Sequence, residues 1–266
     1  MKNVYLPEGS RLGTAENNAY LSTPVAIENA MTCGAIIEGM VMLCDEHLRL
    51  HVDLGCMMGI IEPEDAVYCR AGEEKKDIAI ITRVGKPVAF CILSIEHHGT
   101  HAVAKLSRRL AQQKCVDHYI RSMHPGDLIP AKVTHLEPFG AFLDIGCGIS
   151  SLLSVDCISV SRISHPCDRL TCGGMLTVAV KSIDRETGRI YVTLRELLGT
   201  WEENAAYFEV GQTVKGIIRS VESYGIFVEL APNLAGLAEN RENLAEEVRR
   251  HIGQGAAVYI KSISPE

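Results

Sequence analysis

The sequence has 266 residues, of which 47% are hydrophobic and 22% charged, and its formal net charge is -7. This apolar fraction excludes wholesale disorder, which requires low hydrophobicity together with high net charge. No run approaches the roughly 18–20 apolar residues that span a bilayer, and the first residues turn polar too early for a secretory signal, so we expect a cytoplasmic protein without membrane contact. The acidic balance disfavours purely electrostatic binding of nucleic acid.

The ten cysteines are scattered and include no Cys-x-x-Cys pair. Zinc sites usually combine two such pairs, or one pair with spaced histidines, so we expect no metal and no cofactor. Cys44 and Cys91 lie in apolar runs, where a free thiol behaves as a small hydrophobe, and we expect reduced, buried thiols. His97, His98 and His101 would hold a metal only if a fourth ligand came from elsewhere, and such a cluster is more typical of a solvated loop.

Short helices are predicted at three places along the chain. Thr23 is expected to cap a helix that begins at Pro24. Helical spacing then recurs in apolar residues from Val116, and again from Leu194, where Thr200 and the glutamate three residues later offer a capping box for a further helix. The second and third helical stretches are therefore expected to link larger units.

One sequence pattern occurs three times, and its copies are β-rich. GDLIPAKVTHLEPFGAFLDI from Gly126 aligns without a gap with GQTVKGIIRSVESYGIFVEL from Gly211, and a weaker copy begins at Gly34. The copies end in the similar phrases LSIE, KSID and KSIS. Apolar residues alternate with polar ones, and Gly or Pro punctuates at short intervals, which predicts three homologous small barrels.

The expected division of the chain follows from these copies. It comprises an N-terminal segment with a short helix at 1–33, a degenerate barrel at 34–109, a helical linker at 110–124, a second barrel at 125–195, a helical linker at 196–208 and a third barrel at 209–266. Because the sequence stops two residues after KSIS, we expect the last barrel to lack its final strand, whose open neighbours would then be prone to pair with other chains.

PFGAFLDIG, SLLS and KSIDRETGRIYVTL resemble the RNA-binding domain named after bacterial small-subunit ribosomal protein S-one (S1). The resemblance extends from about residue 34 to the end, is specific in the second and third copies, and is weak in the first. As a whole the chain is similar to the three-module form of this family. The resemblance implies a mainly β protein of three tandem five-stranded OB-type barrels joined by short helices.

Aromatic side chains offer the stacking surfaces that sequence-tolerant binding of single strands requires. The second copy supplies Phe139 and Phe142, and the third supplies Tyr224 and Phe227 at the same spacing. Residues three apart in a regular strand lie on opposite faces, so we expect the glycine inside each pair to adopt positive φ and form a bulge that returns both rings to one face. The alternative is that one ring of each pair belongs to the core.

Other positions follow from the resemblance. The family's histidine beside the rings is replaced by Ser154 in the second copy, which can still hydrogen-bond RNA, and by Glu239 in the third, which repels phosphate. The family's hairpin pair is present as Asp184 and Arg189, for which RNA binding and a plain hairpin salt bridge remain alternatives.

The three copies differ in how complete their expected RNA-binding site is. Lys215 and Arg219 are expected to add cations near the rings of the third copy. Leu48 and His51 occupy the ring positions of the first copy, so no stacking site is expected there. The second copy has the least negative charge of the three and the most complete site.

The predicted function is therefore binding of single-stranded RNA, as a protein of the small ribosomal subunit acting in translation on mRNA. The resemblance implies that the leading module docks the ribosome. The alternative is a regulator that uses its barrels to hold a ribosomal or ribonuclease partner, with little affinity for RNA. No enzyme is expected, because no recognisable motif pairs a nucleophile with a base.

Overall fold

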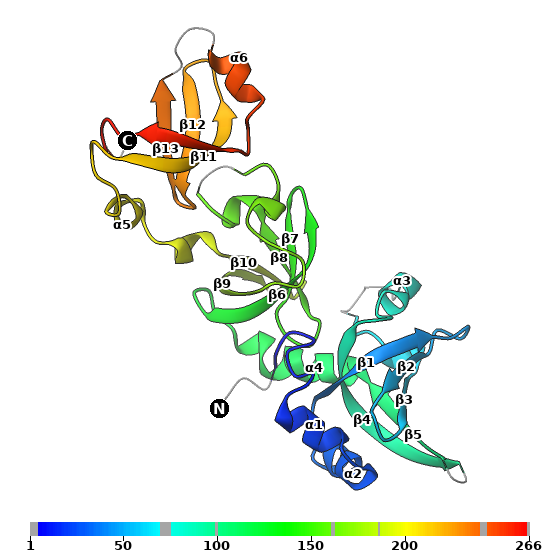
Figure 1. Cartoon of the computed structure of the whole chain (residues 1–266). Helices are drawn as coiled ribbons and strands as arrows, with labels where there is room; N and C mark the ends of the chain where they lie inside the picture. Colours follow the sequence, from blue (N-terminus) through cyan, green and yellow to red (C-terminus); the bar gives the residue numbers. More distant parts are fainter. Residues whose placement is uncertain are drawn as a thin grey trace.

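A computed structural model gives the fold of the chain and describes residues 5–69, 76–98, 101–160, 163–185, 187–239 and 244–264. Figure 1 shows three β units that follow one another in chain order, with the N-terminal helices beside the first unit. No helix in these described ranges has the length and apolar character needed to cross a membrane.

Two short helices precede the first unit, α1 (Ala15–Leu21) and α2 (Pro24–Thr32). The side chain of Thr23 accepts a hydrogen bond from the backbone N–H of Ala26 at 3.2 Å, which confirms the predicted cap and start of α2. Ile27 and Ala30 of α2 are buried in the core of the first unit.

The first unit is a closed five-stranded barrel with the strand order β1-β2-β3-β5-β4. Its strands are β1 (Ile37–Cys44), β2 (Leu50–Asp53), β3 (Met58–Ile61), β4 (Pro87–His98) and β5 (His101–Ser107), with η1 (Pro63–Asp65) and α3 (Asp77–Ile81) between β3 and β4. β3 and β5 are parallel and close the barrel, whereas the other pairs are antiparallel. Fully buried Phe90 is the largest side chain in its core.

The second unit repeats this topology in the order β10-β8-β7-β6-β9. Its strands are β6 (Leu128–Glu137), β7 (Gly140–Asp144), β8 (Ser150–Ser154), β9 (Met175–Asp184) and β10 (Arg189–Thr193), with η3 (Val155–Cys157) and η4 (Pro166–Asp168) after β8. β8 and β10 are parallel, as β3 and β5 are in the first barrel. The two closed barrels confirm the predicted mainly β, barrel-forming fold class.

The third unit is an open four-stranded sheet in the described residues, in the order β13-β12-β11-β14. It consists of β11 (Thr213–Val221), β12 (Gly225–Ala231), β13 (Leu234–Glu239) and β14 (Gly255–Tyr259), with α6 (Leu244–Arg249) before β14. Its core is small, because the buried apolar cluster that the structure describes here contains Ile218, Val221, Ile226 and Val228.

A shared turn shows that the three units are built alike. Gly85, Gly173 and Gly253 all have positive φ, at 73°, 83° and 86°. Each N–H donates to a carbonyl of the unit's first strand, at 2.9, 2.7 and 2.8 Å. The same glycine thus opens the same hydrogen-bonded turn in every unit, since glycine adopts this conformation without a Cβ penalty.

The linkers contain short helices, some of them displaced from their predicted positions. α4 (Arg108–His118) follows β5 directly and is capped by Ser107, and η2 (Ile120–Ser122) follows it. The helix expected from Val116 was therefore placed too late. In the next linker, η5 (Arg195–Leu198) precedes α5 (Trp201–Ala205), and the capping box of Thr200 and Glu203 is confirmed.

The N-terminal segment connects the first barrel to the second. The carboxylate of Glu8 accepts hydrogen bonds from Nε and Nη2 of Arg108, at 2.7 and 3.0 Å, and from the N–H of Ala89 at 3.1 Å. The N–H of Glu8 donates to Oδ2 of Asp144 at 2.7 Å. Because the removal of one partner would leave a buried charge unpaired, these contacts fix the first junction.

A cluster of charged side chains connects the second barrel to the third unit, and we call it the junction cluster. Its members are Asp168, Arg169, Arg219 and Glu229. Glu229 forms an ion pair with Arg169 and accepts a hydrogen bond from Nε of Arg219 at 2.6 Å. Buried Asn233 of the third unit also accepts a hydrogen bond from the N–H of Val160 at 3.1 Å. The second junction is therefore polar and largely buried.

Candidate nucleic-acid interface

Two aromatic rings meet on the outer surface of the second barrel. Phe139 lies in the turn before β7 and is 55% exposed, and Phe142 lies within β7 and is half-buried. Their ring centroids are 6.0 Å apart, and their planes are nearly perpendicular at 89°. Neither ring is among the described side chains that form the buried core. An edge-to-face pair of this kind leaves ring surface available for a base.

The third unit repeats the pair with Tyr224 and Phe227. The centroids are again 6.0 Å apart, at an interplanar angle of 87°, and Tyr224 is 66% exposed. The sequence alignment of the second and third copies therefore places side chains in equivalent positions.

The expected reason for this arrangement was wrong. Neither Gly140 nor Gly225 has positive φ. A Cβ at Gly140 would lie 2.5 Å from the carbonyl oxygen of Leu153, and one at Gly225 would lie 2.5 Å from Cδ1 of Leu237. Glycine is needed at both positions because the neighbouring strand approaches closely.

The two rings meet instead because the first ring lies in the turn before the strand, and because the facing strand carries the bulge. Phe139 precedes β7, so its side chain does not follow the alternation of side chains between the two faces of that strand. The ladder is irregular on β6, between Val133 and His135, and on β11, between Ile218 and Ser220. The expected bulge therefore lies on the facing strand in both units.

Ser154 lies next to the rings, because it pairs in register with Gly140. Its hydroxyl donates to Oδ1 of Asp156, and this hydrogen bond lowers the pKa of Asp156. Glu239 pairs with Gly225 in the same way and forms an exposed ion pair with Lys261 at 3.4 Å. The register thus places both residues in the slot assigned from the sequence.

Asp184 and Arg189 face each other across the β9–β10 hairpin. Asp184 accepts hydrogen bonds from the N–H and the hydroxyl of Thr187, so it shapes the turn. Arg189 is exposed and lies on the outer face of β10. Of this pair, Arg189 is the residue in position to contact a bound phosphate.

The two cations expected near the third ring pair are not gathered there. Arg219 is only 10% exposed in its side chain and is held by Glu229 and Asp168 in the junction cluster. Its guanidinium binds protein carboxylates, and the structure does not support an RNA contact for it. Lys215 is exposed but lies five residues from Ser220, the partner of Phe227, which is about 17 Å along an extended strand.

The first barrel presents no ring at the corresponding positions. Leu48 packs against the core of this barrel with φ of 61°, and Nε2 of His51 lies 3.2 Å from Oδ2 of Asp45. These side chains serve the local structure of the first barrel.

Sequence reasoning missed two outward residues of the second barrel. Leu152 of β8 pairs with Phe142 on one side and with Tyr191 of β10 on the other. The alternation in RIYVT, with Ile190 and Val192 buried, is the signal that places Tyr191 on the outer face.

All ten cysteines are free, but only Cys91, Cys115, Cys147 and Cys157 are buried. The expected burial therefore holds for four of them. Within the described ranges, no three or more His, Cys, Asp or Glu residues gather as a metal site would require. The side chains of His98 and His101 lie outside the described residues, so the histidine cluster is not tested.

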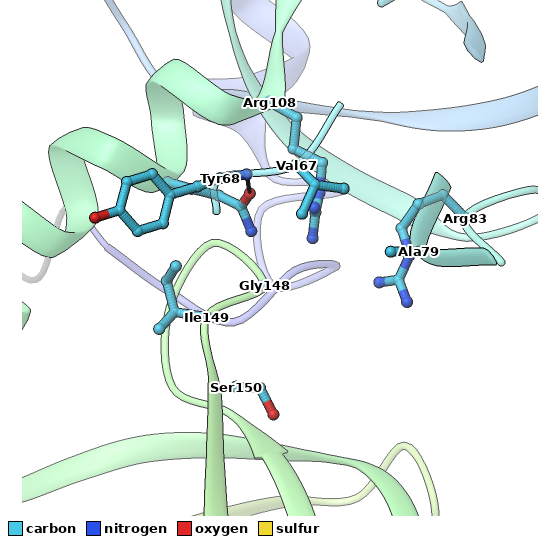
Figure 2. Close-up of a pocket in the computed structure, with 9 residues that line it drawn as sticks. Val67, Tyr68, Ala79, Arg83, Arg108, Gly148, Ile149 and Ser150 are labelled. Atoms are coloured by element: carbon cyan, nitrogen blue, oxygen red, sulfur yellow. Dashed lines mark hydrogen bonds between the residues drawn. The ribbon is translucent and has the colours of Figure 1, made fainter. Parts of the chain in front are cut away.

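A cavity of about 240 Å³ lies at the first junction. Its lining includes Tyr68, Arg83, Arg108, Gly148 and Ile149. Figure 2 shows Arg108 at its centre, between Tyr68 and Arg83. Because Arg108 already donates to Glu8 and, at 3.1 Å, to the carbonyl of Ala66, its guanidinium is satisfied by the protein. We assign this cavity to the junction.

Residues 123–195, which contain the whole second barrel, match the S1 RNA binding domain. The chain thus contains a match to the S1 RNA binding domain in its second barrel. It is 34% identical over 153 residues to small ribosomal subunit protein bS1 of Staphylococcus aureus, a match that covers 56% of this chain and 38% of the relative. It is 35% identical over 113 residues to bS1 of Leuconostoc lactis, which covers 42% of this chain and 26% of that protein. The chain thus spans less than half the length of these relatives.

Among solved structures, an a/eIF2alpha-aDim2p-rRNA complex from Pyrococcus horikoshii is 21% identical to this chain. That match covers 32% of this chain and 51% of the other, with a TM-score of 0.28.

Proposed function

We propose that this chain binds single-stranded RNA through the outer face of its second barrel. The observation that carries the proposal is the exposed ring pair of Phe139 and Phe142 within the residues that match the S1 domain. Each base stacked on an aromatic side chain contributes about 1–3 kcal/mol. On a chain of net charge -7, stacking is then the main favourable contribution and phosphate contacts are secondary.

The third unit is proposed as a further S1-type barrel with a weaker site. Its ring pair and its glycine turn support the equivalence. Glu239 beside the rings and the engagement of Arg219 in the junction cluster both reduce its affinity for RNA. Because β14 is an edge strand of the open sheet in the described residues, we propose that it exchanges its amide hydrogens faster than β9 of the closed second barrel.

The proposed setting is translation, in the cytoplasm, on the small ribosomal subunit and its mRNA. The similarity to bS1 supports this setting. The first barrel, which lacks the ring pair, is the candidate for ribosome docking, and no catalytic activity is proposed. The alternative of a docking regulator with little RNA affinity is disfavoured by the exposed rings, which a purely protein-binding role does not require.

The test is binding of fluorescein-labelled decauridine, followed by fluorescence anisotropy. Phe139→Ala should weaken binding by roughly 1–3 kcal/mol and leave folding nearly unchanged, since the ring is exposed. A variant that melts early yet binds normally would show that the ring belongs to the core.

Cosedimentation tests the ribosomal role. The wild type and a Phe139→Ala/Phe142→Ala variant are sedimented with small subunits, with and without mRNA. The variant should lose the mRNA-dependent part of its binding and keep the rest. Identical behaviour of both proteins would favour the docking regulator.

A further inference from the structure

A row of outward side chains crosses four strands of the second barrel at one level. The ladder pairs His135 of β6 with Phe142 of β7, Phe142 with Leu152 of β8, and Leu152 with Tyr191 of β10. His135 is exposed and the other three are half-buried. The next residues along β7, β8 and β10 are Leu143, Leu153 and Val192, and each is at most 1% exposed. Because neighbouring residues of a strand point to opposite faces, the row lies on the outside.

Tyr191 gives this row a second aromatic position, away from the ring pair. It lies between the buried residues Ile190 and Val192, and it is not among the side chains that pack on the described core of this barrel. No hydrogen bond to its hydroxyl is found within the described part of the chain. A half-exposed aromatic ring on the outer face of a strand is available for a ligand.

The spacing of the row suits consecutive nucleotides. Neighbouring strands lie about 4.8 Å apart, so Phe142 and Tyr191, separated by β8, are about 10 Å apart. A stacked strand of nucleic acid advances about 3.4 Å per nucleotide, and roughly three nucleotides span this distance. Leu152 supplies the apolar floor between the two rings.

The charges around the outer face of the second barrel favour the phosphates of a bound RNA at one end of the row. Glu137, paired with His135 at 2.7 Å, and Asp156 place carboxylates at the Phe139 end. Arg189 lies two residues before Tyr191, on the same face of β10, and is exposed. Phosphates are therefore repelled at the first end and attracted at the second.

The corresponding rows elsewhere lack this second aromatic position. In the first barrel the row is Leu43, His51, Ile60 and Lys105, and Lys105 is paired with Glu96. In the third unit the described row is Ser220, Phe227 and Leu237.

We infer that Tyr191 is a third stacking position and that single-stranded RNA crosses the second barrel from Phe139 and Phe142 over Leu152 to Tyr191. This inference rests on the proposed function and specifies its path. The bases lie on the rings, and the phosphate nearest Tyr191 is bound by Arg189.

The test measures decauridine binding by anisotropy on the full chain. Tyr191→Ala should weaken binding about 5- to 150-fold, whereas Tyr191→Phe should retain it, because the ring face and not the hydroxyl makes the contact. Tyr259→Ala is the matched control, since Tyr259 is an exposed tyrosine on β14 of the third unit, and its affinity should be unchanged.

The outcomes separate the inference from the function on which it rests. If Phe139→Ala weakens binding and Tyr191→Ala does not, the path is wrong and the function stands. If neither variant weakens binding, the proposed function itself is overturned. Ultraviolet crosslinking of the wild type to decauridine, read by mass spectrometry, decides the matter even if Tyr191→Ala fails to fold. A crosslink at Tyr191 is expected, and crosslinks confined to Phe139 and Phe142 would overturn the path.

Discussion

At the scale of single residues, the glycine that starts β7 is required by the strand that faces it. In Gly140→Ala the new Cβ would meet the carbonyl oxygen of Leu153 at 2.5 Å, and a backbone atom of this kind cannot move away cheaply. We expect the variant to lose about 1–3 kcal/mol of unfolding free energy, measured by urea denaturation. Gly236→Ala is the control, because its Cβ would meet nothing closer than 3.9 Å. Equal stability of both variants would contradict this account.

Asp144 is the residue whose protonation should affect the first junction. Burial, followed by the nearby Glu8, raises the pKa of Asp144 to about 7, although three backbone N–H groups donate to it. A carboxyl group whose pKa is higher in the folded state binds its proton more tightly when the protein is folded. Its stabilising contribution is therefore complete at pH values below the unfolded-state pKa of 3.8, and it is lost as the pH rises through the folded-state pKa of about 7. Between pH 4 and 7, the wild type should therefore lose stability relative to Asp144→Asn. Parallel pH profiles from thermal unfolding would refute this.

At the scale of elements, the strands were predictable and some helix positions were not. Apolar and polar residues alternate with a period of two in β6 and β11, and this pattern can be read from neighbouring residues alone. The observed burial alternates in the same way. The helix expected from Val116 was misplaced because its apolar spacing serves the turn η2, whereas α4 starts at the cap formed by Ser107. The start of α4 is set by its cap and by the strand that precedes it, and the spacing of apolar residues does not indicate either.

The outer face of the second barrel was predictable only where it depends on residues that are close in sequence. The position of Phe139 and Phe142 follows from a local motif, and their contact is as expected. The burial of Arg219 depends on Asp168 of another barrel, and the place of Tyr191 beside Leu152 depends on a parallel pairing over 39 positions of sequence. Contacts of this range are set by the assembled fold.

This face should give RNA binding only a modest salt dependence. With two or three phosphate contacts, and about -0.7 per contact on single strands, the slope of log affinity against log salt should be about -2. The measurement is anisotropy over a range of potassium chloride concentrations, and Arg189→Gln should make the slope shallower by about one contact. A slope steeper than about -5 would mean that a basic surface other than this face dominates.

At the scale of the whole molecule, one position of the repeat serves both junctions. Asp144 pairs with Lys132 across β6 and β7, and Glu229 pairs with Ile217 across β11 and β12, so the two acids are equivalent. Asp144 accepts from the N-terminal segment at the first junction, and Glu229 holds two arginines at the second. In the first barrel the equivalent residue, Asp53, is exposed. An acid at this position therefore connects a unit to the part of the chain that precedes it.

The junction cluster should set the orientation of the third unit relative to the second barrel. Glu229→Gln removes the carboxylate that Arg169 and Arg219 share. Loss of one partner from a buried pair costs about 3–5 kcal/mol. Small-angle X-ray scattering should then show a larger radius of gyration and a broader distribution of distances, because the third unit moves independently. Lys261→Gln is the control, since its ion pair with Glu239 is exposed and such pairs contribute little. If Glu229→Gln scatters like the wild type, the orientation is set by the neighbouring contacts of Asn233 instead.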